Sequence, residues 1–133
     1  MKVLIPGGAG YIGSVLTPYM LEEGFEVTVV DNFMYKQNSL AAVCHHPGFR
    51  IFNGDIRDHE LMKQLLDWAD VVIPLAALVG APLCMKDPYT ATAINHDATV
   101  GLIHMVSPQK WILMPTTNSA YGTGDKNHFC TLP

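Results

Sequence analysis

Short apolar runs alternate with longer amphipathic segments along most of the chain. The apolar runs cover residues 2–5, 26–30, 49–52, 71–74 and 110–114. The first run is short and apolar, which is typical of a strand buried on both faces, and the run at residues 49–52 is a weaker strand candidate. Between these runs, apolar residues recur at helical spacing over residues 11–23, after Asp58, and from Asp87 to about residue 106. Strands that alternate with helices in this way predict a parallel sheet with right-handed crossovers, and therefore a doubly wound α/β fold.

Local signals mark where the predicted helices begin and end. Gly24 is a helix stop, and Asp58 and Asp87 can each cap a helix N-terminus, the latter with Pro88 in the first turn. Pro18 lies inside the first helix, where it either removes a backbone hydrogen bond or kinks the helix. The predicted buried face of this helix consists of Tyr11, Ile12, Val15, Leu16, Met20 and Leu21.

A glycine-rich turn joins the first predicted strand to the first helix. Its glycines Gly7, Gly10 and Gly13 are spaced three residues apart. The first permits a tight turn, the second lets a phosphate approach the backbone, and the third allows close packing of helix and strand. The free amides at the helix start, around Tyr11 and Ile12, would face the anion. The turn therefore predicts a pyrophosphate site, and a glycine-rich turn without a ligand is the alternative.

An acidic residue, Asp31, ends the second predicted strand. A carboxylate at this position can accept hydrogen bonds from the hydroxyls of an adenosine ribose, and it would repel a 2′-phosphate. This pattern favours NAD over NADP, and the neighbouring Asn32 is a candidate for a second cofactor-binding residue. A solvated carboxylate at a strand end is the alternative interpretation.

Composition narrows the classes of function. The chain has 133 residues, of which 49% are hydrophobic, so it can form one domain with a substantial core. Its formal net charge of −4 does not suit binding to a phosphate backbone, so we expect no nucleic-acid partner. No apolar run is long enough for a membrane span and the start does not resemble a signal peptide, so we expect a cytoplasmic protein. The three cysteines lack metal-ligand spacing, and we expect no metal site.

Five segments together resemble a known family. They are residues 7–13, Asp31-Asn32, Gly54-Asp55-Ile56, Leu75-Ala76-Ala77 and residues 116–122. In this order they resemble the extended short-chain dehydrogenases/reductases, which are NAD-dependent sugar-nucleotide epimerases and dehydratases with a Rossmann domain. Residues 75–84 and 117–122 look most similar to the branch that acts on GDP-heptoses.

The resemblance implies roles for individual residues at the cofactor. Asp55 would accept a hydrogen bond from the exocyclic amino group of adenine, and Ile56 would pack on the ring. The small residues of the segment Leu75, Ala76 and Ala77 would line the pyrophosphate and ribose. Asn95 matches a helix asparagine that supports the site by hydrogen bonding. Each role has an alternative: Asp55 could be an aspartate of an ordinary turn, the segment 75–77 could serve packing alone, and Asn95 could be an exposed helix residue.

The resemblance also implies a reaction. Thr117 matches the family's catalytic serine or threonine, whose hydroxyl hydrogen-bonds the substrate oxygen as hydride moves. A loop threonine that satisfies backbone groups is the alternative. Asn118 and Ser119 stand where the dehydratases carry an Asp-Glu pair, which argues against dehydration. We therefore expect NAD-dependent oxidation or epimerisation of a nucleotide sugar, with hydride transfer at C4 of the ring.

One part of the family pattern is missing from the sequence. The family's general base belongs to a Tyr-x-x-x-Lys motif, and no tyrosine of this chain has a lysine four residues later. We therefore expect residues 1–133 to be the NAD-binding Rossmann domain of a longer enzyme, lacking the last strand or strands and the substrate domain. Such a polypeptide would be inactive alone. A short, non-catalytic NAD-binding or regulatory protein is the alternative, and a homodimer is an open expectation.

Overall fold

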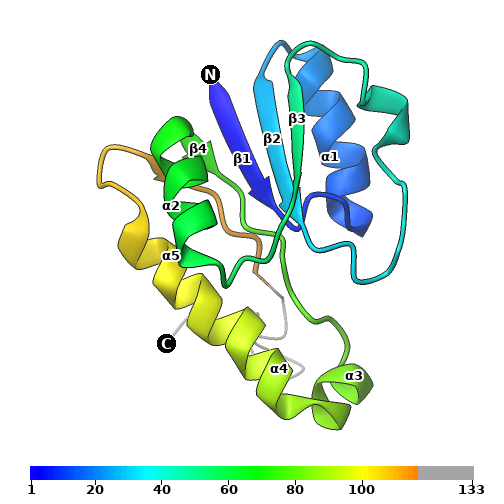
Figure 1. Cartoon of the computed structure of the whole chain (residues 1–133), viewed down its shortest axis with the longest axis vertical. Coiled ribbons are helices and arrows are strands. Elements are labelled where there is room, and N and C mark those ends of the chain that lie inside the picture. Colours follow the sequence, from blue (N-terminus) through cyan, green and yellow to red (C-terminus); the bar gives the residue numbers. More distant parts are fainter. Residues whose placement is uncertain (117–133) are drawn as a thin grey trace, which may run out of the picture.

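A five-stranded parallel sheet forms the centre of the molecule, for which the computed structural model describes residues 1–116 (Figure 1). The strands are β1 (Lys2–Pro6), β2 (Glu26–Asp31), β3 (Phe49–Asn53), β4 (Val71–Val72) and β5 (Trp111–Ile112). Their order across the sheet is β3-β2-β1-β4-β5, and every neighbouring pair is parallel. The chain therefore starts in the middle, proceeds to one edge, and crosses back to build the other edge. This order confirms the predicted doubly wound α/β fold.

Helical segments follow the strands in the order that the sequence predicts. They are α1 (Tyr11–Glu22), a 3₁₀ turn (Ala41–Val43), α2 (His59–Trp68), α3 (Ala81–Lys86), α4 (Pro88–Thr92), a π-helical segment (Ala93–Ala98) and α5 (Thr99–Met105). Figure 1 shows α4, the π segment and α5 as one long continuous helix. The sequence predicts this helix as a whole, but neither its π segment nor the short α3. Among the described residues, no helix is long and apolar enough to cross a membrane.

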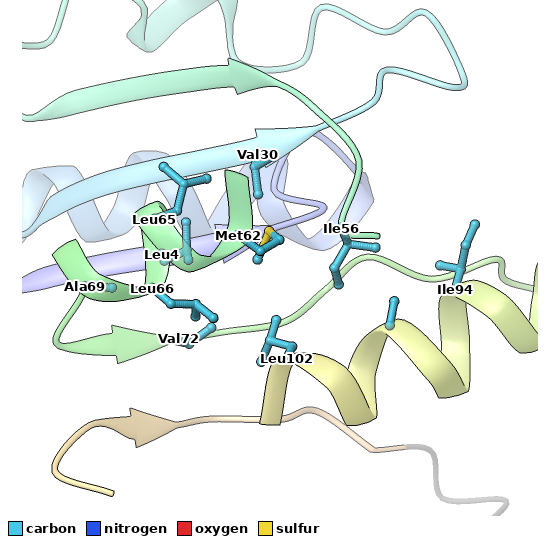
Figure 2. Packing of buried hydrophobic residues seen from close by; sticks show 11 residues of the cluster. Leu4, Val30, Ile56, Met62, Leu65, Leu66, Ala69, Val72, Ile94 and Leu102 are labelled. Atoms are coloured by element: carbon cyan, nitrogen blue, oxygen red, sulfur yellow. The ribbon is translucent and has the colours of Figure 1, made fainter. Parts of the chain in front are cut away.

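Two hydrophobic cores lie on opposite faces of the sheet. Leu4 and Val72 belong to the core under α2 and α5, whose packing is shown in Figure 2. Val3 and Ile5, which precede and follow Leu4 on β1, belong to the core under α1. Successive side chains of a strand point to opposite faces, so β1 supplies fully buried residues to both cores. A strand used in this way has to be apolar throughout, as the sequence pattern indicates.

The face through which α1 packs agrees only in part with the predicted one: Leu21 is buried and Leu16 and Met20 pack against the core, as predicted, but Tyr11, Ile12 and Val15 do not. The buried residues are Gly13, Thr17 and Leu21, whereas Tyr11 is 92% exposed and Val15 is 70% exposed. A Cβ atom on Gly13 would overlap the backbone of Gly8, so the helix lies closest to the preceding turn at its smallest residues. The spacing of large apolar side chains in a sequence does not reveal where two backbone segments come close together. The helix continues through Pro18 without interruption.

The predicted helix caps are confirmed. In α2, Oδ1 of Asp58 accepts a hydrogen bond from the amide of Leu61 at 3.1 Å. In α4, Oδ1 of Asp87 accepts from the amide of Thr90 at 3.0 Å, and Pro88 occupies the first turn. Each carboxylate satisfies a backbone donor that the helix itself leaves without a partner.

Candidate functional site

A cleft of about 440 Å³ opens at the carboxyl ends of the central strands. In doubly wound sheets this is the edge where ligands bind, because the strand order reverses there. Every residue that the sequence predicts for cofactor binding lines the cleft, apart from Asn95. These residues are Gly7, Gly10, Tyr11, Ile12, Gly13, Asp31, Asn32, Asp55, Ile56, Leu75, Ala76 and Ala77. The structure thus brings together segments that are far apart in the sequence.

The three glycines of the turn have different surroundings. Gly7 has a positive φ of 77°, and a Cβ on it would overlap the backbone of Ala76 just beyond β4. Gly13 is equally confined by Gly8. In contrast, a Cβ on Gly10 would meet only the carbonyl oxygen of Gly7, at 3.2 Å. The first and third glycines are therefore required by the fold, whereas the space next to Gly10 is free for a ligand.

The carboxylate of Asp31 connects the glycine turn to the loop after β2. Its Oδ2 accepts a hydrogen bond from the amide of Ala9 at 3.0 Å, and its Oδ1 accepts from the amide of Phe33 at 2.9 Å. An ionised carboxylate offers about four acceptor positions. Each oxygen of Asp31 therefore keeps capacity for a further donor, such as a ribose hydroxyl. The carboxylate lines the cleft together with the glycine turn.

Two residues that the sequence analysis missed hold the same turn from the other side. The carbonyl oxygen of Ala9 accepts hydrogen bonds from Nε2 of Gln37 at 2.9 Å and from Oγ of Ser39 at 2.6 Å. Both donors lie in the irregular segment between β2 and β3. Such a segment has no periodicity, so its long-range contacts leave no signal in a single sequence.

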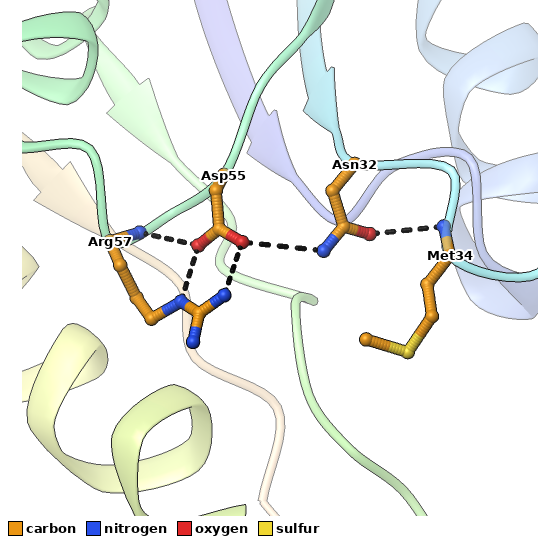
Figure 3. A network of polar contacts seen from close by, with 4 residues as sticks. All are labelled: Asn32, Met34, Asp55 and Arg57. Atoms are coloured by element: carbon orange, nitrogen blue, oxygen red, sulfur yellow. Dashed lines mark hydrogen bonds and ion pairs between the residues drawn. The ribbon is translucent and has the colours of Figure 1, made fainter. Parts of the chain in front are cut away.

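Asp55, just after β3, is the centre of a polar network (Figure 3). Arg57 donates to both of its carboxylate oxygens, from Nε to Oδ1 and from Nη2 to Oδ2, each at 2.8 Å. Nδ2 of Asn32 donates to Oδ2 over a longer distance of 3.4 Å. These contacts lower the pKa of Asp55 from 3.8 to about 2, and the hydrogen bond from the Arg57 side chain is the largest cause. Asp55 therefore carries a full negative charge at neutral pH.

Asn95 stands behind the cleft rather than in its wall. Its Oδ1 accepts from the amide of Leu78 at 2.7 Å, while its Nδ2 donates to the carbonyl oxygen of the same residue at 2.9 Å. Leu78 lines the cleft directly after the segment of small residues. Asn95 thereby fixes this segment to the π-helical part of the long helix, and its contact with the cleft is indirect.

The predicted catalytic residue, Thr117, lies outside the described residues, as do Asn118 and Ser119. Strand β5 ends at Ile112, and the described residues end at Thr116. The described part of the cleft thus contains residues predicted for cofactor binding but not the predicted catalytic residue.

Comparisons with known proteins agree with this geometry. The sequence model of the NAD dependent epimerase/dehydratase family matches residues 3–132. A UDP-N-acetyl-alpha-D-glucosaminuronate decarboxylase of Bacillus cytotoxicus is 33% identical, over 92% of this chain and 38% of its own length. A UDP-glucose 4-epimerase of Streptococcus mutans is also 33% identical, over 95% of this chain and 38% of its own length.

A solved structure shows the same arrangement of elements. The UDP-glucuronic acid 4-epimerase of Bacillus cereus, in complex with UDP-glucuronic acid and NAD, superposes with a TM-score of 0.84 at 27% identity. The match covers 94% of this chain and 43% of that protein. The chain thus spans about two fifths of the length of these relatives.

Proposed function

The chain belongs to the NAD dependent epimerase/dehydratase family, and from this premise we propose that its cleft holds NAD for the oxidation or epimerisation of a nucleotide sugar. The observation that carries the proposal is the meeting of the glycine turn, Asp31 and Asp55 around one cleft. Each of the three suits a different part of the dinucleotide. The family match and the NAD-containing structure of a relative support the same cofactor.

The parts of NAD have distinct places in this proposal. The pyrophosphate lies over Gly10, near the amides at the start of α1, where an added side chain would occupy its space. The adenosine ribose donates hydrogen bonds to Asp31, and adenine lies between Ile56 and the carboxylate of Asp55. The segment Leu75, Ala76 and Ala77 forms the opposite wall. Asn95 keeps this wall in place through Leu78.

The proposed reaction is hydride transfer at C4 of the sugar ring, and bound NAD supplies the hydride acceptor. Thr117 would hydrogen-bond the oxygen whose carbon is oxidised, which stabilises the developing carbonyl. The relatives named above are enzymes of UDP sugars, so they support a nucleotide-sugar substrate. They give no support to the narrower resemblance to GDP-heptose enzymes. The homodimer stays a prediction.

Substitution of Gly10 tests where the pyrophosphate lies. Gly10→Val adds methyl groups to the cleft, and its Cβ would make one tight contact of 3.2 Å with the carbonyl oxygen of Gly7, far less overlap than a side chain on Gly7 or Gly13 would cause. Isothermal titration calorimetry should show that the wild-type protein binds NAD and that the variant does not. Gly101→Val is the matched control, because a Cβ on Gly101 in α5 meets only the His59 ring, at 3.7 Å and away from the cleft. Unchanged NAD affinity in Gly10→Val would contradict the proposed placement.

A further inference from the structure

Arg57 surrounds one side of the Asp55 carboxylate. Its guanidinium makes two hydrogen bonds of 2.8 Å, one to each carboxylate oxygen, and its backbone amide donates to Oδ1 at 2.9 Å. A two-point contact between guanidinium and carboxylate fixes both the distance and the plane of the carboxylate. Asp55 is therefore held in a single orientation by a residue only two positions away.

The remaining acceptor position of Asp55 faces the cleft. Of its about four acceptor positions, Arg57 fills three, and the amide of Asn32 takes the fourth through the longest bond of the network, 3.4 Å. Asn32 lines the cleft with Asp55, whereas Arg57 is not among the lining residues. Figure 3 shows the carboxylate between the two side chains. An N–H donor that enters from the cleft would thus arrive on the Asn32 side and replace the weakest bond.

We propose that Arg57 is a positioning residue for adenine recognition, because it orients the Asp55 carboxylate so that one edge faces the cleft. The side-chain amide of Asn32 occupies the position that the adenine amino group would take. The proposal rests on the proposed function, because it requires adenine to lie against Asp55. It assigns a role in base specificity to a residue that itself stays outside the cleft.

The effect of Arg57 at neutral pH is one of geometry rather than of protonation. Without Arg57 the pKa of Asp55 would return toward 3.8, which is still far below pH 7. Asp55 would remain ionised in either case. Any change in base preference at pH 7 must therefore come from the orientation of the carboxylate. Lysine keeps the charge but lacks the planar fork, so Arg57→Lys should behave as Arg57→Gln does.

Nicotinamide hypoxanthine dinucleotide provides the test, because its base carries a carbonyl oxygen where adenine carries the amino group. By calorimetry at pH 7, the wild-type protein should bind NAD about tenfold more tightly than the hypoxanthine analogue, as expected for one hydrogen bond to a charged group. Asp55→Asn should abolish this preference. Arg57→Gln and Arg57→Lys should each reduce it to about threefold or less.

Arg50→Gln is the matched control, because it removes the same charge. The Arg50 guanidinium lies over the Trp68 ring at 5.7 Å and does not line the cleft. This variant should keep the full preference for NAD. As a second readout, NMR titration of the Asp55 carboxyl group should show that its pKa rises in Arg57→Gln and stays low in Arg50→Gln.

The possible results separate the two proposals. If the wild-type protein binds both dinucleotides equally, Asp55 does not face adenine, and the proposed placement fails together with the role of Arg57. If Asp55→Asn loses the preference but both Arg57 variants retain it, Asp55 recognises adenine without help, and only the role of Arg57 is refuted. An Asp55 pKa that does not move in Arg57→Gln would equally refute it.

Discussion

At the scale of single residues, the two carboxylates of the cleft are held in different ways. Within residues 1–116, Asp31 accepts hydrogen bonds from the backbone amides of Ala9 and Phe33 alone, and so retains acceptor capacity on both oxygens. Asp55 is enclosed by a guanidinium and has one exposed edge. The first arrangement suits a pair of ribose hydroxyls, and the second suits a single N–H donor.

The charge of Asp31 should determine the choice between NAD and NADP. A 2′-phosphate placed beside this carboxylate would experience like-charge repulsion of roughly 1–3 kcal/mol in a partly shielded site. Asp31→Asn keeps the shape and removes the charge, so it should narrow the preference for NAD by about tenfold or more. Calorimetry with both dinucleotides measures this, and equal affinities in the wild-type protein would contradict it.

The position of Asp31 could be predicted because it ends a strand of clear apolar pattern, whereas Asp55 was identified through the resemblance to the family. The sequence then places both at the same edge of a parallel sheet. Their partners could not be predicted in the same way. Gln37 and Ser39 reach Ala9 from an irregular loop, and nothing in the sequence around them indicates which backbone oxygen they bind. Arg57 lies close in sequence to Asp55, but its side-chain direction depends on the turn after β3.

At the scale of elements, α1 shows where pattern and packing disagree. The sequence predicts its ends well, but Gly13 and Thr17 are buried beside Leu21, whereas the larger Tyr11 and Val15 are exposed. Close approach of the helix to the glycine turn selects small residues at the contact. Hydrophobic periodicity measures side-chain character and not the distance between backbones. The π segment was missed for a different reason: it shifts the phase of the apolar pattern at one point only, and the helical stretches on either side, Pro88–Thr92 and Thr99–Met105, are short.

Thr17 is predicted to lower the stability of the protein. Its side chain is fully buried, and among the described residues Oγ1 has no hydrogen-bond partner. Burial of a hydroxyl without a partner is unfavourable, so Thr17→Val should raise the free energy of unfolding by about 1 kcal/mol. Urea denaturation monitored by circular dichroism measures the change.

Thr17→Ser is the control for this prediction. It keeps the hydroxyl and deletes a buried methyl group, so it should destabilise the protein by about 1 kcal/mol. A valine variant that is less stable than the wild type would show that the hydroxyl has a partner in solution.

At the scale of the whole molecule, the cleft joins segments from both halves of the sheet. Its walls come from the turn after β1, the loops after β2 and β3, and the chain beyond β4. The parallel sheet could be predicted from the alternation of elements, and with it the edge where ligands bind, but the strand order could not, because more than one order satisfies the crossover rule. The depth and the lining of the cleft could not be predicted, because they depend on the conformations of loops. Residues such as Met34, Tyr35 and Val79 line it without any preceding signal.

Binding of NAD should therefore stabilise the whole folded unit. A ligand at about one hundred times its dissociation constant adds roughly 2.7 kcal/mol to the free energy of unfolding. We expect NAD to raise the thermal midpoint of the wild-type protein by several degrees and to leave that of Gly10→Val unchanged. Differential scanning calorimetry provides the measurement. A midpoint in the wild-type protein that does not respond to saturating NAD would contradict binding across both halves.

The π-helical segment that carries Asn95 has a consequence for insertions and deletions. Loss of one residue normally rotates the rest of a helix by about 100° and moves its buried residues to the wrong face. A π segment already contains one residue more than the corresponding α-helical turn. A single-residue deletion within Ala93–Ala98 would restore a regular helix and leave Leu102 of α5 directed into its core. The chain can therefore shorten here without losing its fold, and the part it would lose is the two-point contact between Asn95 and Leu78 that holds the wall of the cleft.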